Sequence, residues 1–224
     1  MKYISAGILA VLSAVVVFLA LGEKVKIFNV LSIEENEKKL TVKMPLRIVL
    51  TVIAAAVGFT ATVMLYKYCS VTINILRLQF AYICIAGAAC VDLRECRIPN
   101  VFPAAMAIAG IVALAAMYFT DVEGVMAYML SSVVGTVACA VCMFIVYALT
   151  KGGIGMGDIK LLCALSLLCG ANSLGCTVAV GAVSCGLVTA VLLIMKKKKI
   201  KDDALPFAPF AFLGFAVSVI LPIS

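Results

Sequence analysis

Long uncharged apolar runs occupy most of this chain and restrict what it can fold into. They cover residues 3–22, 48–66, 78–91, 98–120, 124–150, 161–195 and 204–224. A helix needs about 20 apolar residues to cross a bilayer. With 65% hydrophobic and only 13% charged residues, and a mean hydropathy of +1.22, the chain is not an ordinary soluble domain. The sequence predicts an all-α, polytopic transmembrane helical bundle.

The lengths of the runs predict how many spans there are. The sixth run is too long for one helix and contains a turn-like cluster, GANSLG, at 170–175, so we expect it to break there. This gives about eight spans: two in an N-terminal region, 1–71, which holds a charged loop at 22–47, and six in a core, 72–224. Residues 1–22 have some features of a signal peptide, but their apolar stretch is long for one, so a retained helix is favoured.

The basic residues predict the orientation of the spans. Loops on the cytoplasmic side carry an excess of Lys and Arg. With the N-terminus outside, all of the 18 basic residues except Lys2, Lys67 and Arg77 fall in inner loops. We therefore expect a multi-pass protein of the cell membrane. The formal charge of +7 indicates contact with anionic lipids and no nucleic acid, because the basic residues lie between apolar runs.

The reactive side chains narrow the possible chemistry. The chain has no histidine, which excludes Ser-His and Cys-His nucleophile pairs and His-ligated zinc. Most of the ten cysteines lie inside apolar runs, where Cys behaves as a small hydrophobe, and the CxxC of Cys139 and Cys142 has no second pair. We expect no metal and no cofactor. Carboxylate chemistry or a Ser-Lys pair remains, the latter from Lys160 with Ser131, Ser132 or Ser166.

Two aspartates lie at the edges of apolar runs: Asp92 in VDLRECRIPN and Asp158 in KGGIGMGDIKLL. A carboxylate at membrane depth is expensive and by default marks a functional site. From Asp158 to the expected break is only about 20 Å of helix, short of the ~30 Å hydrocarbon core. Either the helix begins before Asp158, or Asp158 lies in a re-entrant Gly-rich loop. The third span must include Arg77 or end at Asp92, and Pro99 suits the first turn of the next helix.

Simpler interpretations of each acid stay open. Asp158 would serve as a helix N-cap after a flexible turn, and Asp92 would be a solvated interfacial charge beside Arg94 or Arg97. The alternative function is a non-catalytic transporter or assembly factor that uses the two acids to bind protons or a cation. Both acids fall toward the cytoplasmic face in the predicted topology, which leaves such a transporter without a path of acids across the membrane.

Taken together, the motifs resemble those of the type IV prepilin peptidases and the archaeal preflagellin peptidases, membrane aspartic proteases of the GxGD type. The shared blocks are Asp92 followed by IPN at 98–100, GGxGxGDxKL at 152–161, and PFxPF at 206–210. Their order and spacing match over about 72–224. Ala208 replaces the glycine usual in the last block. The loop at 22–47 has no cysteine, whereas bifunctional members carry a Cys-rich segment there, so the resemblance implies a short form without methyltransferase activity.

The resemblance also implies a function. It is that of a leader endopeptidase acting on prepilin- or pseudopilin-like substrate helices in the membrane, at the cytoplasmic face. Asp92 and Asp158 would be catalytic, supported by Gly155, Gly157, Lys160, Pro99 and Asn100. Two carboxylates that share a water hydrolyse an amide when one is ionised and the other protonated. Helix dipoles would favour ionised Asp158 at a helix start and protonated Asp92 at a helix end.

Overall fold

The computed structural model describes residues 72–120, 122–150, 154–194 and 206–220, with isolated helical positions between 11 and 63. Every regular element of the four long ranges is a helix: α3 (Thr72–Glu95), α4 (Val101–Thr120), α5 (Val122–Leu149), α6 (Met156–Cys169), α7 (Ala171–Ile194) and α8 (Ala208–Ile220). The predicted all-α class is confirmed for this part of the chain. The loop at 22–47 and most of the two predicted N-terminal spans lie outside the described residues.

Four of these helices, α3, α4, α5 and α7, are long and apolar enough to cross a membrane. The helices α6 and α8 have only 14 and 13 residues, which is about 20 Å of helix against a hydrocarbon core of ~30 Å. The chain is therefore a membrane protein with four candidate spans in its described part. The figure of about eight spans stays a prediction.

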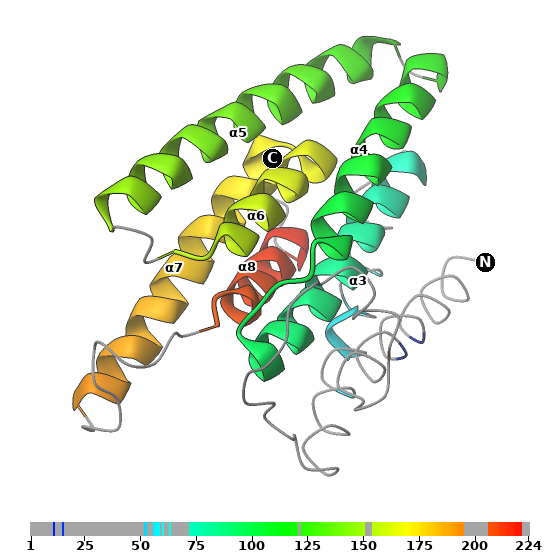
Figure 1. The fold of residues 1–224 in the computed structure, drawn as a ribbon. Helices are drawn as coiled ribbons and strands as arrows, with labels where there is room; N and C mark the ends of the chain where they lie inside the picture. The colour runs from blue at the N-terminus through cyan, green and yellow to red at the C-terminus, as the bar shows by residue number, and fades with distance from the viewer. Residues whose placement is uncertain are drawn as a thin grey trace.

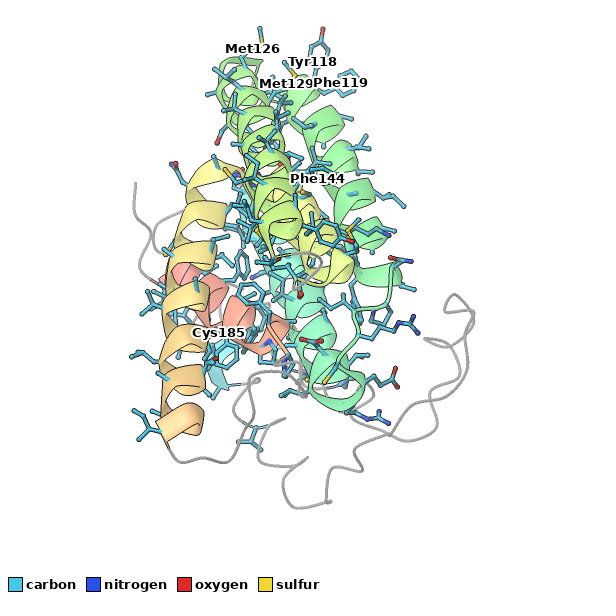
Figure 2. The ribbon with its side chains drawn as sticks, turned by 60° about the vertical axis from the view of Figure 1, so that its left-hand side comes forward. Tyr118, Phe119, Met126, Met129, Phe144 and Cys185 are labelled. Atoms are coloured by element: carbon cyan, nitrogen blue, oxygen red, sulfur yellow. The ribbon has the colours of Figure 1, made fainter. Side chains whose placement is uncertain are left out.

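The two short helices lie among the long ones (Figure 1). The helix α6 packs against α3, α4, α5 and α7, and α8 packs against α3 and α7. Leu161, Leu165 and Leu168 of α6 and Phe215 of α8 are at most 1% exposed. Figure 2 shows Tyr118, Phe119, Met126 and Met129 together on the outside, at the end where α4 and α5 meet. Apolar side chains on the outer faces suit a lipid environment, whereas the short helices pack with α3 in the core.

The long sixth run breaks as expected, but over one residue. The helices α6 and α7 are separated by Gly170 alone, whose φ of +85° is a conformation that suits glycine. Residues 171–175 of the predicted turn are helical instead. The helix α5 supplies the polar partners that a helix junction needs: the Tyr128 hydroxyl donates to the carbonyls of Leu167 and Leu168 at 3.0 and 2.7 Å, and Ser131 Oγ accepts the N–H of Ala171 at 3.0 Å.

The junction between α3 and α4 carries the first acidic motif. As expected, α3 includes both Arg77 and Asp92. The Arg77 guanidinium lies 3.9 Å from the centre of the Tyr128 ring, which stabilises a cation inside an apolar helix. Pro99, expected in the first turn of α4, lies two residues before it. The reason is that the Asn100 carbonyl accepts the N–H of Ala104 at 3.1 Å, so Asn100 occupies the position before the first helical residue.

Candidate active site

Asp92 lies in the last turn of α3, with its backbone carbonyl accepting the N–H of Cys96 at 2.8 Å. The residue is only 4% exposed, which excludes the solvated interfacial charge. Its Oδ2 accepts the N–H of Ala208 at 3.0 Å, and the carboxylate also accepts the N–H of Phe207. The start of α8 is therefore bound directly to Asp92, across 116 residues of sequence.

Asp158 lies in the first turn of α6, in the half-buried surroundings of the Gly-rich segment. The residue before the helix is Gly155, not Asp158, so the N-cap interpretation of Asp158 is wrong. Asp158 instead stands three residues further on, where its carboxylate accepts the N–H of Gly155, as the acidic member of a capping box does. Its other oxygen, Oδ1, is buried and has no hydrogen-bond partner in the described part of the chain.

The two carboxylates are close enough to interact electrostatically. Burial, followed by the charge of Asp92, raises the pKa of the Asp158 carboxyl to about 6, and the hydrogen bond from Gly155 opposes this rise only in part. Two neighbouring carboxylates cannot both ionise without mutual repulsion. An acid with a pKa near 6 can hold or release a proton close to neutral pH, as acid–base chemistry requires.

The motifs that carry the two acids also touch one another. Gly157 lies directly against Ile98: a Cβ built at Gly157 would be 3.1 Å from the Ile98 Cβ. Beside this contact, the Lys160 ammonium donates to the Asn100 side-chain oxygen at 3.3 Å. Pro99 is half-buried between these two contacts. The fold thus brings together the supporting residues expected from the sequence, and glycine at 157 permits the close approach.

Comparison with known protein families shows which family this chain belongs to. Residues 78–194, more than half of the chain, match the type IV leader peptidase family. The chain belongs to this family. Its members are prepilin leader peptidases, so the protein is a hydrolase. Both aspartates and both of their motifs fall inside the matched residues, whereas the 206–210 block lies beyond them. No curated protein and no solved structure matches the chain.

None of the three candidate serines of this leader peptidase is hydrogen-bonded to Lys160. Ser131 binds the α6–α7 junction, and Ser132 and Ser166 are fully buried. Ser166 Oγ lies against Gly135 of α5, where a Cβ would meet it, and Lys160 is exposed and bonded to Asn100. The structure does not bring Lys160 together with any of the three serines as a catalytic pair.

The nine cysteines that the structure describes form no metal cluster. Cys139 of the CxxC packs against Cys163 of α6, in a small apolar cluster with Leu162 and Leu174. All the cysteines that the structure describes are free thiols, and these residues hold no group of three or more ligands suited to a metal ion. The expectation of a small hydrophobic role agrees with this packing.

The partners of Asp92 in the 206–210 block were not foreseen from the sequence. Backbone N–H groups leave no residue-type pattern, so the only signal was the block itself, with prolines at 206 and 209 around the start of an apolar run. Proline favours the first turn of a helix, and this marks where α8 begins but not what its free N–H groups bind.

Proposed function

We propose that this leader peptidase is an aspartic endopeptidase in which Asp92 and Asp158 share one water molecule. The observation that carries the proposal is the electrostatic contact between the two carboxyl groups, joined to the unpartnered Oδ1 of Asp158. A buried oxygen without a hydrogen bond is costly, and a water held between the two acids would satisfy it.

The reaction needs one proton on the pair. The ionised carboxylate takes a proton from the water, whose oxygen attacks the carbonyl carbon of the peptide bond. The protonated carboxyl donates to the carbonyl oxygen, and the tetrahedral intermediate then collapses as the C–N bond breaks and the amine nitrogen takes a proton. Because the two acids interact, they titrate as a coupled pair, and activity is expected only while one proton is shared.

The proposed substrates are type IV prepilin-like proteins with a short basic leader before an apolar helix, cut at the cytoplasmic face of the cell membrane. Two observations support this substrate class and face: the family match, and the distribution of Lys and Arg, which puts both acidic motifs toward the inside. An apolar substrate helix can enter from the lipid and present the end that carries its leader. The basic loops would contact anionic lipids.

Cleavage of a co-expressed substrate tests the pair. A candidate prepilin is expressed with the wild type, Asp92→Asn or Asp158→Asn, and its electrophoretic mobility reports loss of the leader. Both variants are expected to leave it uncut while inserting normally into the membrane. The matched control is Glu95→Gln, which changes an exposed acid one turn from Asp92 in the same helix and should cut normally.

Two outcomes would refute the proposal. Full cleavage by either Asn variant would exclude an aspartate pair. Proton or cation flux through the wild-type protein in liposomes that both variants abolish, together with cleavage that they leave intact, would favour the transporter.

A further inference from the structure

The 206–210 block joins α8 to the site in a way that the proposed reaction does not yet use. Phe207 ends the turn before α8, because its carbonyl accepts the N–H groups of Phe210 and Ala211 at 3.0 and 3.1 Å. Pro209 has no N–H. The N–H of Ala208 is then a free donor of the first turn, and it points at Oδ2 of Asp92.

This arrangement stabilises negative charge on Asp92. Its carboxylate accepts two backbone N–H groups, from Phe207 and Ala208, and hydrogen bonds from several backbone donors strongly favour the ionised form of a carboxylate. The positive end of the α8 dipole adds to them. Burial of Asp92 acts in the opposite direction and is the larger effect, so an ionised Asp92 depends on these donors.

Asp158 has weaker support for a charge. Among the residues that the structure describes, only Gly155 directs a backbone N–H at its carboxylate, and Oδ1 has no partner. The N-terminal dipole of α6 also acts on Asp158, but burial and Asp92 still raise its pKa to about 6. Asp158 is therefore the member of the pair that keeps a proton more readily.

We infer that Asp92 is the general base and Asp158 the general acid, and that the 206–210 block is the positioning element that keeps Asp92 ionised. This inference rests on the proposed function. It reverses the assignment that the dipoles of α3 and α6 alone suggest, because the helix end that binds Asp92 is the start of α8 and not the end of α3.

Few other titratable groups lie near Asp92 on the elements packed against it. The helix α8 has none, and α4 has only Tyr118, near its far end. On α6 the near groups are Asp158 and Lys160, the latter bonded to Asn100. Further along α6 lie Cys163 and Cys169. The remaining described groups belong to α3 and the turn after it, namely Arg77, Tyr82, Cys84, Cys90, Arg94, Glu95, Cys96 and Arg97.

The pH profile of cleavage by the purified full-length protein tests the inference. Ala208→Pro removes the N–H that binds Asp92, at a position where a helix start tolerates proline. Loss of this donor weakens the support for negative charge on Asp92, and the limb of the bell-shaped profile of kcat/KM that moves identifies its role. If Asp92 is the base, the acidic limb moves to higher pH by about one unit and the alkaline limb stays. Ala208→Gly keeps the N–H and should keep both limbs at their wild-type pH, whatever its rate.

Movement of the alkaline limb instead would reverse the two roles, and an unmoved profile would exclude the 206–210 block as the element that ionises Asp92. A direct titration decides the case in which Ala208→Pro is inactive. Infrared spectra of Asp92→Asn and Asp158→Asn across pH follow the protonated-carboxyl C=O stretch, and the difference between the variants isolates the remaining acid. The carboxyl left in Asp92→Asn should titrate at the higher pH. Equal or reversed midpoints would overturn the assignment, whereas cleavage by either Asn variant would overturn the proposed function itself.

Discussion

The contact between Gly157 and Ile98 offers a direct test of whether the two motifs must touch for catalysis. A Cβ at position 157 would lie 3.1 Å from the Ile98 Cβ, and 3.6 and 3.7 Å from the Ile98 carbonyl oxygen and backbone nitrogen. Carbon atoms in contact prefer about 3.5–4.0 Å. In Gly157→Ala, the segment before Asp158 and the segment before Pro99 must therefore separate by roughly 0.5 Å.

A displacement of this size should change the cleavage rate enough to be measured. A misplacement of 1 Å at an active site can cost about a hundredfold in rate, so half of that distance predicts a loss of about tenfold in kcat/KM. Overpacking costs about 1–3 kcal/mol of stability, and the better helix propensity of Ala over Gly returns up to about 1 kcal/mol. The folded fraction should therefore stay high. Cleavage of a purified prepilin-like substrate by protein in liposomes, with a thermal unfolding curve for each variant, measures both effects.

The matched control is Gly186→Ala, in the middle of α7. Apart from the nearby backbone of α7 itself, no atom of the described residues lies within 4 Å of the Cβ that this change adds, so cleavage should be unchanged and unfolding should occur at the same or a slightly higher temperature. Wild-type kcat/KM in a folded Gly157→Ala protein would show that close approach of the two motifs does not set the geometry of the acids.

Three further predictions follow from other contacts. In Gly214→Ala the new Cβ would meet the backbone of Thr177, whose Cα and carbonyl carbon would lie 3.0 Å away. The helix α8 should therefore be displaced from α7, which lowers both the unfolding temperature and the cleavage rate. An unchanged rate would contradict the support that α8 gives to the site. Because the pKa of Asp158 rises from 3.8 to about 6 on folding, the wild type loses stability as pH increases through this range. Asp158→Asn should therefore unfold at a higher temperature than the wild type at pH 7.5 but not at pH 4, and equal differences at both pH values would refute this. Lys160→Met removes the exposed hydrogen bond to Asn100 and should lower kcat/KM by about two- to fivefold, with Asn100→Ala giving a similar loss and the double variant no more than either alone.

The sequence was sufficient to predict the helical class and a break within 170–175, and its resemblance to a known family implied that the two acidic motifs meet. These depend on features that are visible in the amino-acid sequence: the length of an apolar run, a glycine within a turn-like cluster, and a charged residue in an apolar segment. The orientation and the substrate stay predictions.

The apolar pattern of the sequence did not indicate that α6 and α8 are short helices. An uncharged run has the same pattern whether its helix is long or short, so the sequence did not indicate that α6 and α8 have only 14 and 13 residues. The binding of α8 to Asp92 was also not foreseen, because it depends on backbone N–H groups whose direction is fixed only by the fold.

The attachment of α6 to α5 has a consequence for how the position of Asp158 depends on the thickness of the membrane. Tyr128 and Ser131 of α5 are hydrogen-bonded to the C-terminal end of α6 and the residue that follows the junction. The depth of Asp158 in the bilayer therefore changes when α5 tilts. That helix has 28 residues, about 42 Å, which exceeds a hydrocarbon layer of ~30 Å, and tilting is one way for it to fit. Lipids with longer acyl chains would bring α5 upright and draw the carboxyl group of Asp158 along the bilayer normal, so acyl-chain length becomes a means of tuning proteolysis without any change in the chain itself.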